Sequence, residues 1–321
     1  MYSTPKYSFS AKRLVMQGMT ALLALALLFS LAGCGAAQEE DDGKLQIVTT
    51  TTMLYDLTAS IAGEYADVTA LMGPGIDPHL YQASAGDVTK MQKADIVVYN
   101  GLHLEGKMGD IFAGLTDQGR NIICGGDGID PSVLLADENS PEVYDPHVWF
   151  DVGIWMDVAE HTAEKLGEFD PEHKEAYMTN KEAYVASLTE LDSYIRARAE
   201  ELPESARVLV TAHDAFRYFG KAYGFDVRGL QGISTDAEAG TADVSNLAKF
   251  IADNEIKAIF VESSVPPKNI EALQAAVQAR GFDVAIGGEL YSDSLGDAAS
   301  GADTYVLTCK ANIDTIVDAL K

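Results

Sequence analysis

Strand-like and helical segments alternate along most of this chain, and the alternation restricts its fold more than any other feature. The strand pattern occurs at residues 44–53, 67–72, 95–101, 121–126, 206–213, 225–230, 257–264 and 283–290. Helical spacing of apolar residues separates most of these runs. Continuous apolar strands such as 95–101 are typical of a parallel sheet that is covered on both faces. Right-handed β–α–β units therefore predict an α/β protein with a parallel-type sheet in each half.

One long polar helix is predicted between the two halves. Asp170 and Pro171 offer an N-cap residue and a proline for the first helical turn, and Pro203 ends the segment. Apolar residues form one stripe along it, namely Tyr177, Tyr184, Leu188, Leu191 and Ile195. At ~1.5 Å per residue this helix would be roughly 45 Å long. The predicted organisation is an N-terminal lobe at 45–169, a linking helix at 170–203 and a C-terminal lobe at 204–321.

The N-terminus has the pattern of an export signal. Basic residues precede an apolar run at 21–33, which falls short of the about 20 residues that span a membrane. Residues 1–33 are therefore predicted to be a lipoprotein signal peptide. Leu31–Cys34 resembles a bacterial lipobox, which implies cleavage before Cys34 and a lipid on its sulfur. Residues 34–44 then form an acidic tether. An ordinary signal peptide or a membrane anchor helix is the alternative.

The strongly negative charge limits the kinds of partner that this chain can bind. The net charge is −26, and such a field repels nucleic acid and anionic membranes, so no nucleic-acid partner is expected. Cations are attracted, although charge alone specifies no ligand.

Besides Cys34 the chain has only Cys124 and Cys309. Two cysteines do not make a disulfide framework, and we expect two separate buried thiols, with pairing left open.

Two of the six histidines occur in the same local setting. His79 and His147 each follow Asp-Pro and precede an aliphatic and then an aromatic residue. Proline restricts its own backbone and that of the residue before it. A metal ligand benefits from such rigidity, because less entropy is lost on binding. Asp77 and Asp145 are expected to accept hydrogen bonds from these imidazoles, as outer carboxylates do at metal sites. The alternative is that Asp-Pro-His is turn chemistry and the histidines are incidental.

Two further candidates follow strands of the second half. His213 ends the strand 206–213, and Asp293 follows the strand 283–290. Ligands of such sheets bind at the carboxyl ends of strands, so these side chains can meet His79 and His147 in the crevice between the lobes. Three imidazoles and one carboxylate make a complete set for one divalent transition metal ion. A fourth protein ligand favours holding the metal over using it as a catalyst.

Other possible sites are weaker. His103 could line the crevice, whereas His161 and His173 fall on polar helical segments and are expected to be solvated. Residues 101–107 match Gly-x-x-x-x-Gly-Lys, but Met108 stands where a phosphate-binding loop needs Ser or Thr. Nucleotide binding is therefore rejected. The sequence also has no Gly-x-Ser-x-Gly and no His-Glu-x-x-His motif. We expect that the chain is not an enzyme.

Six motifs together resemble one known family. They are "GIDPHLYQ", "DPHVWFD", "TAHDAFRYFGKAYGF", "LQGISTDAE", "IFVESSVPPKN" and "GGELYSDSLGD". The chain resembles the metal-binding lipoproteins of bacterial zinc and manganese ABC importers, some of which are labelled adhesins, from the lipobox onward. The resemblance implies two α/β lobes joined by one long helix, a metal between the lobes, and limited lobe movement on binding.

The same resemblance implies a site and partners. The family's four ligand positions fall on His79, His147, His213 and Asp293, and Glu262 would support the site without touching the metal. Many manganese members carry glutamate at the position of His213, and many zinc members have a histidine-rich loop that this chain lacks. The cargo is therefore one divalent ion, Zn²⁺ or Mn²⁺. The implied partner is an ABC permease, and the implied state is a monomer outside the cytoplasm, anchored to the cell membrane by its lipid.

Three other functions are compatible with such a chain. A protein of the same fold could bind an organic or chelated-metal ligand, but its crevice should then carry aromatic and arginine residues. A metallohydrolase would need an exchangeable water on its metal. An adhesin role in cell adhesion could coexist with metal import, and no residue argues for or against it.

Overall fold

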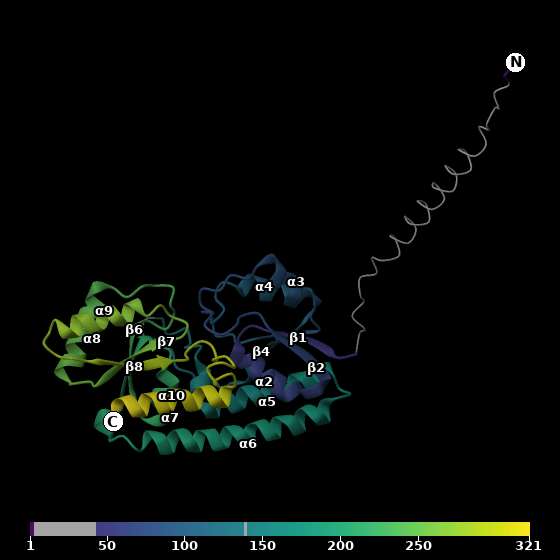
Figure 1. Ribbon diagram of the computed structural model, residues 1–321. Helices are drawn as coiled ribbons and strands as arrows, with labels where there is room; N and C mark the ends of the chain where they lie inside the picture. Colours follow the sequence, from purple (N-terminus) through teal and green to yellow (C-terminus); the bar gives the residue numbers. More distant parts are fainter. Residues whose placement is uncertain (3–42, 138–139) are drawn as a thin grey trace. The chain divides into compact units, whose positions relative to one another are not determined.

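The computed structural model describes residues 1–2, 43–137 and 140–321 (Figure 1). Residues 3–33 of the predicted signal peptide, Cys34 and the tether up to residue 42 lie outside the described residues. Residues Lys44–Lys321 form one compact unit. In the part of the chain that is described, no helix is both long and apolar enough to cross a membrane.

Four parallel strands form the N-terminal sheet, in the order β2-β1-β3-β4. They are β1 (Leu45–Thr49), β2 (Ala66–Ala70), β3 (Ile96–Tyr99) and β4 (Asn121–Cys124). Helices α2 (Thr52–Ala62) and α5 (Val152–Phe169) cover one face, and α3 (Ala85–Lys93) and α4 (Gly109–Asp117) cover the other.

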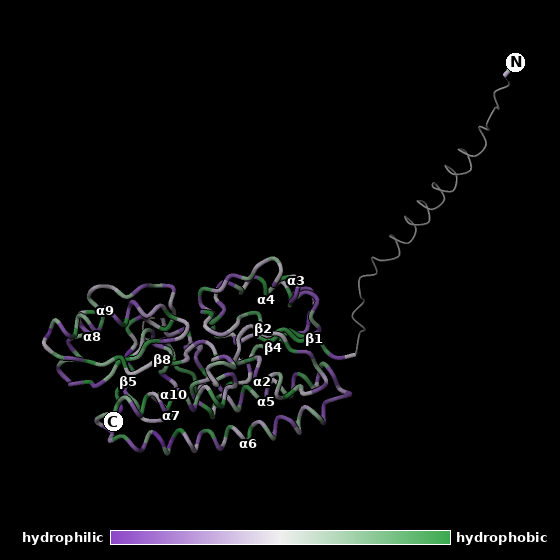
Figure 2. Tube along the Cα trace, in the orientation of Figure 1, coloured by the Kyte–Doolittle hydropathy of each residue, from purple (hydrophilic) through white to green (hydrophobic). Residues whose placement is uncertain are grey.

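Neighbouring residues of these strands point to opposite faces of the sheet. Ile47 and Ile96 are buried against α2 and α5, whereas Val48 and Val97 are buried against α3 and α4. Figure 2 shows the strand region as largely hydrophobic. Burial on both faces explains why these strands are continuously apolar in the sequence.

The C-terminal lobe contains two short sheets. Its strands are β5 (Val208–His213), β6 (Asp226–Gln231), β7 (Ala258–Glu262) and β8 (Ala285–Leu290), and they pair in parallel as β5-β6 and β7-β8. The prediction of one sheet in this half is therefore wrong in detail. A side chain joins the two sheets where β5 and β7 end, because the backbone N–H of His213 donates to Glu262 Oε1 (2.9 Å).

Helices also cover both sides of these strands. Helices α8 (Thr241–Asp253) and α9 (Lys268–Gln278) pack on one side, and α7 (Arg217–Tyr223) and α10 (Tyr305–Leu320) pack on the other. Both halves thus present the carboxyl ends of parallel strands, and the loops that leave those ends carry the candidate site.

The long linking helix is α6 (Lys174–Ala199), and all five residues of its predicted apolar stripe are buried. Its start differs from the prediction. Asp170 ends α5 instead of starting α6, since its N–H donates to Leu166 in the last turn of α5 (2.8 Å). Its carboxylate binds the side chains of His173 and Tyr177 (2.6 Å each). The 26 residues of α6 make a helix about 39 Å long at ~1.5 Å per residue.

One hydrophobic core runs through both halves. It includes residues of α2, α5, α6, α7 and α10, which lie next to one another in Figure 1. The rings of Trp155 and Tyr305 are stacked with their centroids 5.4 Å apart. Trp149 contributes two further links between the halves. Its Nε1 donates to the carbonyl of Ser292 (3.0 Å), and its own carbonyl accepts a hydrogen bond from Tyr305 Oη (2.6 Å). The two halves are thus held together by packed side chains as well as by α6.

Candidate metal centre

The four side chains predicted as ligands meet at one point. One donor atom from each of His79, His147, His213 and Asp293 lies within 4.8 Å of the other three. All four residues are buried, with His79 the most exposed at 4%. Across the described ranges, this is the only such grouping of histidine, cysteine and carboxylate side chains.

Each of the four residues comes from a chain segment next to a strand end or a tight turn. His79 lies in the loop after β2, and His147 precedes the short helix η3 (Val148–Phe150). His213 is the last residue of β5, and Asp293 follows β8 by three positions. The carboxyl ends of parallel strands therefore supply the site, which is where open α/β folds bind their ligands.

Four of the six distances between the donor atoms match those of a tetrahedral site. His147 Nε2 lies 3.2 Å from His79 Nε2, 3.3 Å from His213 Nε2 and 3.5 Å from Asp293 Oδ1. His213 Nε2 lies 3.4 Å from Asp293 Oδ1. Donors bound at about 2.0–2.1 Å in a tetrahedron would be roughly 3.3–3.4 Å apart. His147 is thus within 3.5 Å of each of the other three donors.

Two imidazoles are fixed by carboxylates behind them. His147 Nδ1 lies 2.7 Å from Asp145 Oδ1, and His213 Nδ1 lies 2.6 Å from Glu262 Oε2. An ionised carboxylate can only accept, so each Nδ1 carries the proton and donates it. In the neutral ring, each Nε2 then presents a lone pair to the common centre. The predicted hydrogen bond between Asp145 and its imidazole is confirmed.

The prediction for Asp77 is wrong in its partner. Asp77 Oδ1 accepts a hydrogen bond from the backbone N–H of His79 (2.8 Å), and Oδ2 accepts one from the hydroxyl of Thr235 (2.6 Å). The carboxylate therefore holds the backbone of His79 and not its ring. Sequence reasoning could not find Thr235, because it is 158 positions away from Asp77.

Charges around the site shift the pKa values in opposite directions. Burial alone would lower the pKa of His213, but the carboxylates of Asp293 and Glu262 raise it well above its usual range. Burial alone would raise the pKa of Asp293, but His213 and His147 hold it well below its usual range. For His79 burial dominates and lowers the pKa to about 3. In the absence of a cation, His213 therefore binds a proton more readily than His79 does.

The two carboxylate oxygens of Asp293 face different groups: Oδ1 faces Nε2 of His147 and of His213 (3.5 and 3.4 Å), and Oδ2 faces a hydroxyl. Its Oδ2 accepts a hydrogen bond from Ser264 (3.3 Å), and the Ser264 hydroxyl also lies 2.9 Å from that of Ser292. Its Oδ1 is buried and has no hydrogen-bond partner in the described structure. A buried carboxylate oxygen without a donor is costly unless a cation binds it. Ser264 was not predicted, although it lies in the motif "IFVESSVPPKN".

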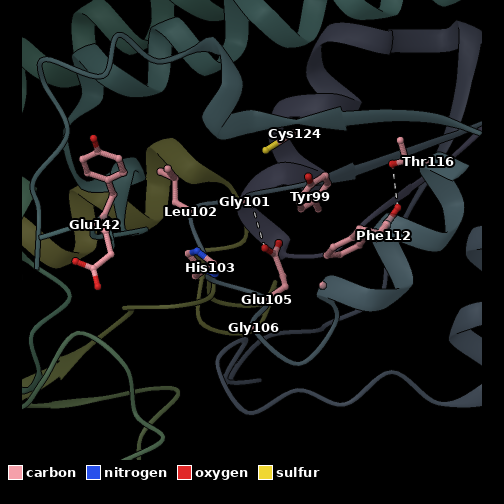
Figure 3. Close-up of a pocket in the computed structure, with 13 residues that line it drawn as sticks. Tyr99, Gly101, Leu102, His103, Glu105, Gly106, Phe112, Thr116, Cys124 and Glu142 are labelled. Carbon is pink, nitrogen blue, oxygen red and sulfur yellow. Dashed lines mark hydrogen bonds between the residues drawn. The ribbon is translucent and has the colours of Figure 1, made fainter. Parts of the chain in front are cut away.

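The other histidines stand apart from this centre. His103 is exposed and lines a cavity of about 470 Å³ with Tyr99, Phe112 and Cys124 (Figure 3). None of the four donors is among the described residues that line this cavity. His161 and His173 are half-buried, with the His173 side chain 33% exposed, so they are only partly solvated, whereas solvated residues were predicted.

Specific contacts account for the burial of these two histidines. The ring of His173 stacks on Tyr65 at a centroid distance of 4.3 Å, and its Nδ1 binds Asp170, as described above. His161 packs against the backbone of Gly128. Both residues therefore have structural partners of their own.

The loop at 101–107 is built in a way that suits no phosphate. Gly101, Leu102 and His103 all have positive φ (79°, 53° and 66°). The buried carboxylate of Glu105 accepts hydrogen bonds from the backbone N–H groups of Asn100 and Gly101 (2.8 and 3.2 Å). The donors that a phosphate would need are thus already occupied by Glu105.

Both described cysteines are free thiols, as predicted, although Cys124 is only half-buried. Burial raises the pKa of Cys124 to about 11 and that of Cys309 to about 12. Neither is therefore a thiolate at neutral pH, and a thiolate is the form that binds metals.

A family model and proteins of known name match most of this chain. The family model described as "Zinc-uptake complex component A periplasmic" matches residues 47–319. The zinc-binding protein TroA of Treponema pallidum (strain Nichols) is 47% identical over 300 residues, which are 93% of this chain and 96% of that protein. The manganese-binding lipoprotein MntA of Bacillus subtilis (strain 168) is 42% identical over 307 residues, covering 95% and 99%.

A solved structure shares the fold as well. The periplasmic zinc-binding protein TroA from Treponema pallidum matches with a TM-score of 0.84 at 49% sequence identity. The match covers 87% of this chain and 99% of that structure. Two α/β lobes joined by one long helix, expected from the sequence, are thus the architecture of the protein.

Proposed function

Because the chain belongs to the family of periplasmic zinc-uptake components, we propose that it captures Zn²⁺ or Mn²⁺ outside the cytoplasm and delivers the ion to the permease of an ABC importer. One observation carries the proposal. Four buried donor atoms lie within 4.8 Å of one another, and one of them, Asp293 Oδ1, has no hydrogen-bond partner among the described residues. A divalent cation is the group that would satisfy all four at once.

We assign His79, His147, His213 and Asp293 as the ligands of the cargo ion. Asp145 and Glu262 orient two of the imidazoles, and Asp77 holds the backbone of His79. Three nitrogen donors favour zinc, while a carboxylate oxygen is acceptable to manganese. The named relatives include one protein called zinc-binding and one called manganese-binding, so the proposal covers both ions.

The same geometry argues against catalysis. Catalytic zinc sites keep three protein ligands and one position open to water or substrate. Here four protein donors surround the centre, and all are buried. A site of this kind holds its ion and excludes water, which suits a carrier. We therefore propose a binding protein and not an enzyme.

We further propose how the protein is organised and anchored. Residues 1–33 act as a lipoprotein signal peptide, Cys34 carries a lipid, and 34–44 is a tether at the cell membrane. An N-terminal lobe at 45–169 and a C-terminal lobe at 204–321 flank the linking segment 170–203, and the protein acts as a monomer. The word "lipoprotein" in the name of the 42% identical relative supports the anchor.

Metal content is the direct test of this function. After separate equilibration with buffered zinc and buffered manganese, the purified chain should hold one equivalent of at least one of these ions. His79→Ala and Asp293→Ala should each remove it, because each deletes one of four donors. Elemental analysis together with protein quantification measures the ratio. If the unchanged chain holds no stoichiometric metal, the proposal fails and an organic ligand becomes the leading candidate.

A second test addresses the carboxylate behind His213. Glu262→Gln should weaken metal binding by about 10- to 100-fold, the usual effect of losing an outer partner of a ligand. Glu262 accepts hydrogen bonds from both the backbone N–H and the Nδ1 of His213, and an amide offers only one accepting oxygen. Competition with a chelator of known affinity measures the change.

Glu271→Gln is the matched control for Glu262→Gln. Glu271 is an exposed residue of α9, so its replacement changes the net charge by the same amount without touching the site. Equal affinities for the two variants would contradict the role assigned to Glu262.

A further inference from the structure

The loop at 232–240 follows β6 in the C-terminal lobe and contacts the segment of the N-terminal lobe that carries His79. Most of its residues are exposed, but Thr235 is buried at 9% exposure. The loop is also held to its own lobe, because Gln231 Nε2 donates to the carbonyl of Ala237 (3.0 Å). One buried residue in an exposed loop indicates a specific contact at that position.

That contact is with Asp77 of the N-terminal lobe. The Thr235 hydroxyl donates to Asp77 Oδ2 at 2.6 Å, and Asp77 Oδ1 accepts the backbone N–H of His79 at 2.8 Å. Pro78 lies between Asp77 and His79 and restricts the backbone of this segment. A single carboxylate therefore connects a side chain of one lobe to the backbone of a ligand in the other.

A second contact joins the same loop to the N-terminal lobe but differs in kind. Lys107 Nζ lies 3.0 Å from Asp236 Oδ2, and these side chains are 40% and 51% exposed. Exposed ion pairs contribute little because water and salt screen them. A hydrogen bond to a half-buried carboxylate such as Asp77 is less screened, and its loss leaves that carboxylate oxygen without this donor. The Thr235 contact is thus the one expected to hold the loop closed.

We propose that Thr235 is a positioning residue, which acts through Asp77 to hold His79 in the closed site and so slows release of the bound ion. The inference rests on the proposed function, because it needs an ion at the four donors. His79 belongs to the N-terminal lobe. In this proposal Thr235 of the C-terminal lobe helps to position it. Opening of the loop at 232–240 would free Asp77 Oδ2 and with it the segment that carries His79.

The test is the rate at which Zn²⁺ leaves the purified chain. The zinc-loaded chain is mixed with excess chromophoric chelator, and release is followed by stopped flow. Thr235→Val keeps the shape of the side chain but removes the hydroxyl, and it should release zinc about tenfold faster. Thr235→Ser keeps the hydroxyl and should restore slow release. Lys107→Met removes the exposed ion pair and should change the rate by less than about twofold.

The outcomes separate the two proposals. Faster release in Thr235→Val, with Thr235→Ser close to the unchanged chain, supports the inference. If the unchanged chain holds one equivalent of zinc and Thr235→Val releases it at the same rate, only the inference is overturned. It is also overturned if Thr235→Ser is as fast as Thr235→Val, because general packing would then explain the effect. A chain that holds neither zinc nor manganese overturns the proposed function and this inference with it.

Discussion

Replacing His147 with alanine is expected to abolish tight metal binding. His147 Nε2 is within 3.5 Å of all three other donor atoms, so its loss opens the centre to water as well as removing a ligand. The affinity should fall by more than the about 10- to 100-fold expected for an outer partner. Titration with zinc against a competing chelator measures it, and the chain should hold no stoichiometric metal after dialysis.

His161→Ala is the control for this change. His161 lies on α5 outside the four-donor cluster, and alanine favours a helix. This variant should keep one equivalent of metal at unchanged affinity. His147→Ala also leaves the buried Asp145 without its imidazole, so circular dichroism must show that the variant is folded. A folded His147→Ala chain that binds zinc as tightly as the His161→Ala chain would refute the assignment.

Metal loading is expected to raise the melting temperature substantially. An ion that binds only the folded chain, at a free concentration about 1,000 times its Kd, stabilises it by about 4.1 kcal/mol. For a domain of this size that corresponds to a shift on the order of 10 °C. The four donors come from both lobes, so unfolding of either lobe destroys the site. Differential scanning calorimetry with and without zinc measures the shift.

The chelator EDTA and one variant test the origin of this stabilisation. Removing the metal with EDTA should return the melting temperature to that of the metal-free chain. Asp293→Ala should show almost no shift on addition of zinc, because it lacks the only carboxylate among the four donors. A shift of equal size in Asp293→Ala would mean that zinc stabilises the chain from another place.

The sequence predicts well that these four side chains come together, because they lie beside features that can be recognised locally. His213 ends a run of β-branched and apolar residues, and the structure has it as the last residue of β5. His79 and His147 carry the repeated Asp-Pro context. Parallel strands align their carboxyl ends, so residues from two lobes can be assigned to one crevice without knowing any distance. The family resemblance pointed to the same positions.

What could not be predicted depends on contacts between distant parts of the chain. Asp170 and Pro171 have the composition of a helix start, yet α5 continues to Phe169 and takes Asp170 as its end. Local signals cannot decide between two helices that meet at one residue. The hydrogen bonds of Thr235 and Ser264 are likewise set by how the loops pack. The split between β5-β6 and β7-β8 also arises from packing, since each strand alone has the pattern of any parallel strand.

The core shared by both halves has a consequence for how such proteins can diversify. Trp149 donates to the carbonyl of Ser292 and accepts from Tyr305, and the backbone N–H of Leu295 donates to the hydroxyl of Thr52 (2.7 Å). The halves are therefore not exchangeable modules. A chimera that took one half from a relative would pair two contact surfaces, one from each protein, that had not evolved together. Recombination within the family should thus succeed where whole chains or surface loops are exchanged, and fail where a crossover falls in α6.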